Sequence, residues 1–365
     1  GVASWFCLFP DKDGEPEYED GMIDTNVSRQ CLLCGARADV QWFDHPGYQE
    51  PLTFNIIHCE NCNTSFPEPQ SVNHNIYDRI YSIRSSIPAY NRYERYAREV
   101  RLSKNPLDYL ANSENVYWAI REYFNQQSSR ADRKVLEVGS GLGYLTYSLN
   151  MAGINTVGID ISAVAVDEAT KRFGNYFSCQ SVEEHSKNAV NKYDVVILTE
   201  VIEHVCDISS LIEAIKLVLV EGGDIVITTP NKSNYPSHAL WCTDPPPVHV
   251  WWLSEESFRY LSKTNHLSLK YIDFTKYNQS WYRFYAPNSD LSIPTRKPIL
   301  DAKGSIRADK GALIYSFIKG LERFGLRNIT KIVYITLLQI TARVYIFIRK
   351  PDLRRSDTLC AVLTK

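Results

Sequence analysis

Residues 135–146 read VLEVGSGLGYLT, a β-branched stretch that leads through an acidic residue and several glycines into a helix-forming segment. Gly139, Gly141 and Gly143 let the backbone pass close to a ligand, and the amides at the start of the following helix favour an anionic group. The next β-branched stretch, TVGID, ends in Asp160, where a carboxylate can bind both hydroxyls of a ribose. The pattern predicts a site for a nucleoside-containing ligand, although nicotinamide and flavin enzymes use a similar glycine turn.

Short β-branched stretches continue to alternate with helical ones between Lys134 and Phe274. The stretches are VLEVG, TVGID, DVVILT, DIVITT and LSLKYIDF, with LIEAIKLVLV at helical period among them. This alternation predicts an α/β domain built on a doubly wound, mostly parallel sheet.

The composition places the chain among ordinary globular proteins. A length of 365 residues is more than one compact core takes, so we expect a main domain with appendages. With 44% hydrophobic and 22% charged residues, wholesale disorder and a rod-like fold are excluded. Forty basic against 42 acidic side chains give a net charge of -2, which argues against a protein that coats nucleic acid over its whole surface.

Changes in composition divide the chain into segments. We expect a leader that is foreign or disordered (1–21), a zinc-binding module (22–72), a helical linker or lid (73–110), the nucleoside-binding domain (111–290) and a basic, partly helical C-terminal extension (291–365). In the extension, basic residues outnumber acidic ones by fourteen to four between Arg296 and Arg355. This excess favours a phosphorylated or lipid-linked acceptor or an anionic membrane surface, with a solvated helix face as the alternative.

Two cysteine pairs predict a zinc site in the N-terminal module. CLLC at 31–34 and CENC at 59–62 are separated by 24 residues, and each pair can present both sulfurs to one ion. Gly35 and Asn63, which follow the pairs, tolerate the left-handed turn of such a knuckle. Four thiolates (Cys31, Cys34, Cys59 and Cys62) close the coordination shell, so we expect a structural ion. Paired cysteines without a secretory signal favour a reducing, cytoplasmic location, with peripheral contact at the inner membrane surface left open.

A second group of metal-ligand residues follows the third β-branched stretch. In DVVILTEVIEHV (194–205), Glu200, Glu203 and His204 are spaced i, i+3 and i+4, and on a helix they would share one face. The proline-rich WCTDPPPVHVWW can bring His249 to the same sheet edge. The group could hold a hard cation such as magnesium. A generic helix start with Glu203 exposed and His204 packed, or a metal-free base, remain as alternatives.

The glycine motif ExGxGxG at Glu137 to Gly143, followed by Asp160, resembles the class I S-adenosylmethionine-dependent methyltransferases over residues 110–275. The resemblance implies that the three glycines line the methionine part of this cofactor and that Asp160 binds its ribose. The further cofactor residues that it implies are Glu137, Ile161, Gln180, Ser181, Val182 and Thr199. TEVIEHV, a later TPN and a histidine are similar to the ubiquinone O-methyltransferase group and to small-RNA 2′-O-methyltransferases, in which two glutamates and two histidines hold magnesium. The corresponding residues here are Glu200, Glu203, His204 and His249, of which Glu200, His204 and His249 are the catalytic candidates.

An N-terminal four-cysteine module joined to a core of this kind resembles bacterial enzymes that modify nucleotide sugars or surface polysaccharides, and the WCTDPPPVH segment fits that group. Sugar C-methyltransferases share the module but carry another glycine motif than the GSGLG found here, so the resemblance favours O-methylation. We therefore expect a small-molecule or glycan hydroxyl as acceptor, with nucleic acid disfavoured. The alternatives are a sugar C-methyltransferase, an RNA 2′-O-methyltransferase and a non-catalytic zinc-containing binding module; the oligomeric state is not predicted.

Overall fold

The structure is a computed structural model that describes residues 29–87, 90–127, 132–235, 244–281, 298–307 and 352–365. The predicted leader and most of the predicted basic extension lie outside the described residues. Among the residues that are described, we find no helix with the length and hydrophobicity that a membrane span requires.

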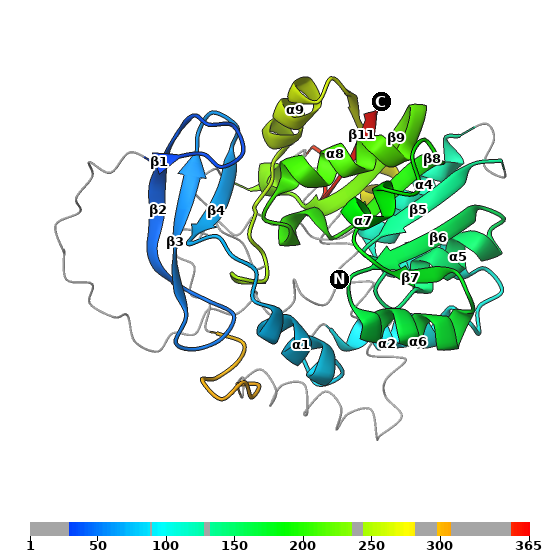
Figure 1. The fold of residues 1–365 in the computed structure, drawn as a ribbon, viewed down its shortest axis with the longest axis horizontal. Helices are drawn as coiled ribbons and strands as arrows, with labels where there is room; N and C mark the ends of the chain where they lie inside the picture. Colours follow the sequence, from blue (N-terminus) through cyan, green and yellow to red (C-terminus); the bar gives the residue numbers. More distant parts are fainter. Residues whose placement is uncertain (1–28, 88–89, 128–131, 236–243, 282–297, 308–351) are drawn as a thin grey trace.

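The N-terminal module is a small antiparallel sheet, drawn in blue in Figure 1. Its strands follow the order β1-β2-β3-β4 and are β1 (Arg29–Gln30), β2 (Arg37–Pro46), β3 (Thr53–Cys59) and β4 (Thr64–Glu68). One CxxC turn follows β1 and the other joins β3 to β4, so the pairing of the strands brings the two turns together. Gly35 and Asn63 adopt left-handed backbone conformations, as the knuckle prediction requires.

Helices connect this module to the main sheet. They are α1 (His74–Ile83), α2 (Asn91–Glu99), α3 (Pro106–Ser113) and α4 (Asn115–Asn125). Asn73 accepts a hydrogen bond from the amide of Ile76 and so caps α1, and Pro106 occupies the first turn of α3. Both residues are common helix-start signals. α4 is buried along most of its length because it covers one face of the main sheet.

The main sheet has seven strands in the order β10-β11-β9-β8-β5-β6-β7. The strands are β5 (Lys134–Val138), β6 (Asn155–Asp160), β7 (Phe177–Cys179), β8 (Tyr193–Thr199), β9 (Leu219–Pro230), β10 (Ser268–Tyr271) and β11 (Thr358–Thr364). The helices between and after them are α5 (Tyr144–Met151), α6 (Ala163–Phe173), α7 (Val182–Ser186), α8 (Ile208–Val218), α9 (Glu255–Thr264) and α10 (Thr275–Trp281). β5, β6, β7, β8 and β9 pair in parallel. The predicted doubly wound α/β fold is therefore confirmed.

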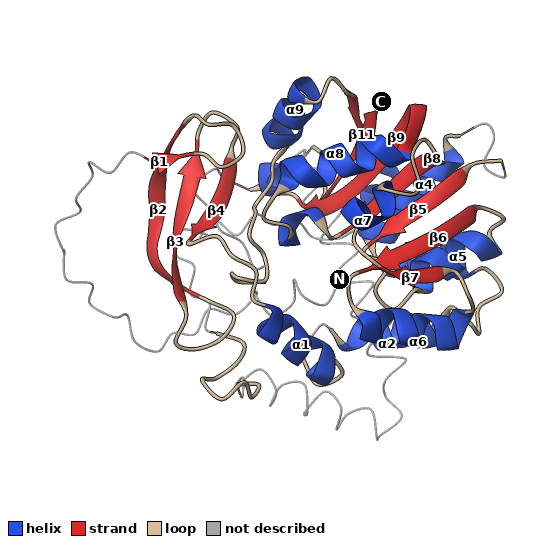
Figure 2. Cartoon of the chain, in the orientation of Figure 1, coloured by secondary structure: helices blue, strands red, loops and turns tan. Residues whose placement is uncertain are grey.

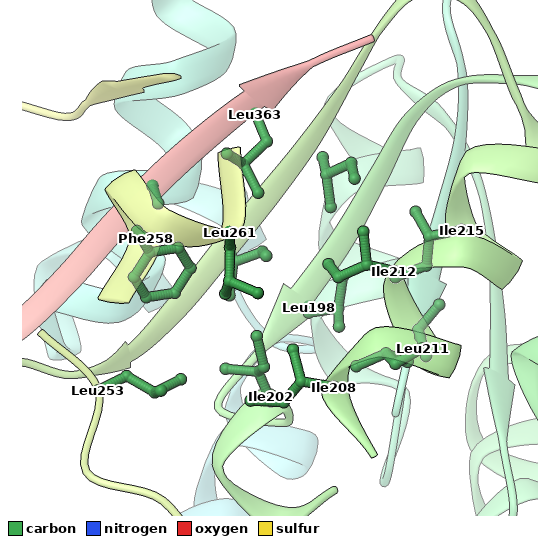
Figure 3. Close-up of a cluster of buried hydrophobic side chains, with 14 of the residues drawn as sticks. Leu198, Ile202, Ile208, Leu211, Ile212, Ile215, Leu253, Phe258, Leu261 and Leu363 are labelled. Atoms are coloured by element: carbon green, nitrogen blue, oxygen red, sulfur yellow. The ribbon is translucent and has the colours of Figure 1, made fainter. Parts of the chain in front are cut away.

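Helices cover both faces of this sheet, as Figure 2 shows. On one face, α8 and α9 bury Ile212 and Phe258 against Leu198 of β8 and Leu363 of β11 (Figure 3). On the other face, α4 and α5 pack against a second set of strand residues, including Val135, Ile197 and Val226. Burial on both faces explains why the central strands read as continuous apolar stretches.

The end of the chain departs from the predicted domain boundary at residue 290. β11 lies between β9 and β10 and runs antiparallel to both, with Ala361 opposite Ile227 and Tyr271. The final strand therefore belongs to the main domain and not to an extension, because its pairing completes that sheet. Residues 298–307, also assigned to the extension, lie instead against the N-terminal module, where the amides of Ile299 and Leu300 donate to the carbonyl of Tyr48.

Candidate functional site

The glycine turn connects β5 to α5 at the carboxyl edge of the sheet. The amides of Gly139 and Ser140 donate to the carbonyl of Ile159, which ties the turn to β6. Gly143 has a φ of +76°, and a Cβ there would lie 2.5 Å from the ring of Phe177, so only glycine fits. At Gly141, by contrast, a Cβ would meet no heavy atom of the described residues within 4 Å. The turn is thus packed on its inner side and open at Gly141, where a ligand can approach the backbone.

Asp160 ends β6 beside this open glycine. Its Oδ2 atom accepts a hydrogen bond from the amide of Gly141 and its Oδ1 atom accepts one from the amide of Ser162, both at 2.8 Å. Burial raises the pKa of Asp160, and the two amide donors oppose that shift. Each oxygen keeps a second lone pair, so an oriented carboxylate remains able to accept from a diol.

The other residues predicted for the cofactor have different surroundings. Glu137 is buried and accepts a hydrogen bond from Thr146 of α5, so it supports the turn from within the domain. Ile161 is 72% exposed directly after Asp160, and the amide of Gln180 donates to the carbonyl of Asp160. The side chain of Ser181 caps α7, Val182 is buried in the core, and the Oγ1 atom of Thr199 is buried without a hydrogen bond to any described residue.

The predicted helical face of Glu200, Glu203 and His204 is wrong. Glu200 has a φ of +54°, and the chain then forms a short 3-10 turn, Ile202–His204, instead of continuing into an α-helix. The left-handed residue breaks the helical spacing on which the prediction depended. In the described residues, Glu203, His204 and His249 can place one ligand atom each within 4.8 Å of one another, and Glu200 does not join this group.

Hydrogen bonds indicate which atoms carry a proton and which have a free lone pair in this acid–histidine cluster (Glu203, His204 and His249). The Nδ1 atom of His204 lies 2.8 Å from the carbonyl oxygen of Val248. Because a carbonyl only accepts, Nδ1 carries the proton and the lone pair is on Nε2. Thr229 donates to Oε2 of Glu203 at 3.0 Å, whereas Oε1 is buried and has no hydrogen bond within the described part of the chain. Glu203 is fully buried, so the alternative with an exposed Glu203 is also wrong.

Burial sets the electrostatics of the cluster. It raises the pKa of Glu200 to about 8, raises that of Glu203 well above its ordinary value, and lowers the pKa of His204. The nearby charge of Glu200 adds to the shift at Glu203. A cation bound here would favour the ionised carboxylate of Glu203, which is the donor chemistry of a divalent metal site.

Asp244 and Tyr90 also lie beside the acid–histidine cluster. Asp244 lies 3.9 Å from Nε2 of His249, and the hydroxyl of Tyr90 donates to the same carboxylate oxygen at 2.7 Å. Asp244 stands in the quoted WCTDPPPVH segment five residues before His249, and that proximity was the available signal. Tyr90 directly precedes α2 and is 154 positions before Asp244, so the fold brings the two side chains together.

Residues 111–269 match a family model described as a methyltransferase domain. We use this description as the name of the segment, which is less than half of the chain. Over 183 residues the chain is 32% identical to the mitochondrial ubiquinone biosynthesis O-methyltransferase of Bos taurus, covering 44% of this chain and 48% of that protein. A ubiquinone biosynthesis O-methyltransferase of Hydrogenovibrio crunogenus is 34% identical over 125 residues, covering 33% and 51%. The chain thus spans about half the length of these curated relatives.

Among solved structures, a SAM dependent methyltransferase from Archaeoglobus fulgidus is similar at a TM-score of 0.43 and 15% identity, covering 75% of this chain and 99% of that one. The resemblance predicted from the glycine motif is confirmed by the family match and by the curated relatives. The methyltransferase domain contains the glycine turn, Asp160 and the acid–histidine cluster, whereas Tyr90 lies before it.

The predicted cysteine cluster lies outside the methyltransferase domain. Cys31, Cys34, Cys59 and Cys62 place their sulfurs within 4.8 Å of one another, and all four are free thiols. The Cys31–Cys62 and Cys34–Cys59 sulfurs are 3.6 and 3.5 Å apart, close to the roughly 3.7 Å edge of a tetrahedral zinc–thiolate site. The hydrogen bond between Cys31 and Cys62 lowers the pKa of Cys31 to about 5 and raises the pKa of Cys62, so this pair favours one thiolate. These residues fit zinc.

Proposed function

We propose that the protein is an S-adenosylmethionine-dependent O-methyltransferase. The observation that carries this proposal is the position of Asp160. Its carboxylate is oriented by the amides of Gly141 and Ser162 beside the open face of the glycine turn, at the sheet edge where α/β domains bind ligands. The family match of residues 111–269 supports the same reaction class.

In this proposal Asp160 binds the ribose hydroxyls and the turn from Gly139 to Gly143 receives the methionine part. Ile161, exposed beside Asp160, provides an apolar surface for the adenine. Gln180 and Ser181 complete this surface in the proposal, since the amide of Gln180 donates to the carbonyl of Asp160. Glu137 acts indirectly in this proposal: it accepts a hydrogen bond from Thr146 and so stabilises the first turn of α5, and it does not contact the ligand itself. Thr199, at the end of β8, has a hydroxyl that is available to a bound molecule.

The acceptor hydroxyl would bind at the acid–histidine cluster. Glu203, His204 and His249 fit a divalent cation such as magnesium because they converge and because Oε1 of Glu203 is buried without a hydrogen bond in the described residues. Such an ion supplies Lewis-acid stabilisation of an alkoxide. Glu200 is not part of the group whose ligand atoms lie within 4.8 Å of one another, so we assign the ligand role to the other three.

In this proposal the residues of the chain remove the proton of the acceptor hydroxyl and exclude water from the site. The ligand role and a base role are alternatives for His204, because Nδ1 already donates to Val248 and only the Nε2 lone pair remains. In a cluster without a cation, this lone pair can take the proton that leaves the acceptor hydroxyl. The oxygen forms a bond to the methyl carbon as the carbon–sulfur bond breaks, and the sulfonium becomes the neutral thioether of S-adenosylhomocysteine. Burial of the cluster excludes water from this transfer.

For the acceptor we propose a hydroxyl of a sugar, a nucleotide sugar or a surface polysaccharide. Polar groups near the cluster support this choice, since Asp244 and the hydroxyls of Tyr77 and Tyr90 lie beside the histidines and can bind neighbouring hydroxyls. A phosphorylated or lipid-linked acceptor and peripheral contact with an anionic membrane are extensions that rest on the basic residues after Arg296, most of which are outside the described part. The free thiols of the cysteine cluster suit a reducing compartment such as the cytoplasm.

Calorimetry with S-adenosylmethionine tests the reaction class. We expect binding that Asp160→Ala abolishes and that Glu203→Gln and His249→Ala leave within about twofold, because the latter residues belong to the acceptor side. Incubation with candidate acceptors, followed by mass spectrometry, should then show methyl incorporation that is lost in Glu203→Gln and slowed by chelation of magnesium. A protein that serves recognition alone would bind no S-adenosylmethionine, and full activity in excess chelator would exclude the cation.

A further inference from the structure

Residues 244–254 form a strap that crosses between the methyltransferase domain and the N-terminal module, and His249 lies in its middle. Towards the domain, the amide of Val250 donates to the carbonyl of Glu203 at 2.8 Å. The indole of Trp251 donates to the carbonyl of Val205, also at 2.8 Å. The strap is therefore tied directly to the turn that carries Glu203 and His204.

Towards the module, the same strap continues the hydrogen bonding of β4. Ser65 and Trp252 exchange both main-chain hydrogen bonds, at 3.1 and 2.8 Å. Ser254 donates through its hydroxyl to the carbonyl of Cys62, in the second CxxC turn, at 3.0 Å. The strap thus has the module along one side and the acid–histidine cluster along the other.

Two side chains from outside the methyltransferase domain hold the carbonyls on either side of His249. The side-chain amide of Gln70 donates through Nε2 to the carbonyl of Val250 at 2.9 Å. The hydroxyl of Tyr77 donates to the carbonyl of Val248, also at 2.9 Å. Tyr77 is in addition 3.0 Å from Nδ1 of His204, and the two rings meet edge to face at 79°.

We propose that Gln70 and Tyr77 are positioning residues for the acceptor site. They clamp the main chain before and after His249 and so set where its imidazole lies relative to Glu203 and His204. Because the hydroxyl of Tyr77 donates to the carbonyl of Val248, its oxygen can only accept from Nδ1 of His204, which keeps the proton of His204 on Nδ1. This assigns the N-terminal module and α1 a part in the reaction beyond folding: they complete a site whose ligands all belong to the methyltransferase domain.

The clamp matters because a cluster of three ligands tolerates little displacement. A shift of about 1 Å in a supporting residue is enough to weaken a metal or catalytic site. The consequence for cation and acceptor binding rests on the proposed function, whereas the effect on the order of the strap does not. The two can therefore be measured separately.

Hydrogen–deuterium exchange tests the clamp without any ligand. Gln70→Leu and Tyr77→Phe remove the donors and keep the side-chain size, and the double variant removes both. We expect amides in 248–254 to exchange about three- to tenfold faster in each single variant, the effect of one neutral hydrogen bond, and faster still in the double variant, with peptides of β5 and β8 unchanged. The matched controls are Gln126→Leu, at the exposed residue that directly follows α4, and Tyr109→Phe on α3. Unchanged exchange in the double variant would overturn the proposal.

Manganese binding, measured by electron paramagnetic resonance, reports the consequence for the site. We expect its affinity to fall about three- to tenfold in each single variant while S-adenosylmethionine binding stays within about twofold. Equal losses of both affinities would mean a general loss of structure and would also overturn the positioning role. If the unmodified protein binds no manganese, the cation in the proposed function fails, and the exchange experiment still decides the clamp.

Discussion

Replacing Asp160 with Asn tests the centre of the cofactor site in two measurements. Both oxygens of Asp160 accept a main-chain N–H, from Gly141 and from Ser162, at 2.8 Å each. An Asn side chain has only one oxygen, so in either orientation its NH₂ group faces one of these donors. The substitution therefore perturbs the turn even though it preserves shape.

The two effects have separate magnitudes. A buried donor left facing another donor costs about 1–3 kcal/mol, and this should appear as a lower free energy of unfolding of the ligand-free protein. The loss of a charged acceptor for one ribose hydroxyl costs about 1.5–3 kcal/mol, which is about a 10- to 150-fold rise in the Kd for S-adenosylmethionine. Urea titration measures the first quantity and calorimetry the second.

Asp167→Asn is the matched control, because Asp167 is an exposed residue of α6 whose partner is Lys171 on the same helix. It should change neither quantity measurably. If Asp160→Asn binds S-adenosylmethionine within twofold of the unmodified protein, Asp160 is not the ribose ligand. An unchanged free energy of unfolding would instead mean that the two amide hydrogen bonds contribute nothing to the turn.

Three further substitutions test the supporting structure. Burial raises the pKa of Glu137 to about 8, so the folded protein retains a proton that the unfolded chain releases near its ordinary pKa of 4.5, and stability should fall as pH rises between these values. Glu137→Gln should remove up to about 1.4 kcal/mol per pH unit of that slope in urea titrations, and an identical slope would contradict the assigned pKa. Gly143→Ala should cost about 1–3 kcal/mol more than Gly153→Ala, since both glycines have φ near +77° but only the first is crowded by its neighbours; equal losses in Tm would refute the steric argument. Cys62→Ser should lower both the zinc content, measured by elemental analysis, and the Tm. Substitution of the exposed Cys179 by Ser should leave the zinc content and the Tm unchanged, and a normal zinc content in Cys62→Ser would exclude that thiol as a ligand.

Much of the fold follows from short-range patterns. The alternation of β-branched and helical stretches predicted the parallel strands β5, β6, β8 and β9, because strand and helix periodicities are local properties. The glycine turn with Asp160 and the two CxxC pairs were recognisable for the same reason, since their chemistry is carried by spacings of a few residues. β11 was missed because its partners β9 and β10 are far away in the chain, and its apolar stretch follows a long basic segment.

The acceptor side shows what local sequence determines and what it leaves to the tertiary structure. TEVIEHV and the later His249 suffice to name the chemical groups, since residue types are written in the chain. Their geometry depends on one left-handed residue, Glu200, which breaks the expected helix, and on a strap held by Gln70 and Tyr77 from another part of the molecule. These hydrogen bonds join segments more than a hundred residues apart, and such contacts arise only when the whole sheet and the module have packed together, because no local periodicity encodes which distant backbone carbonyl a side chain will reach.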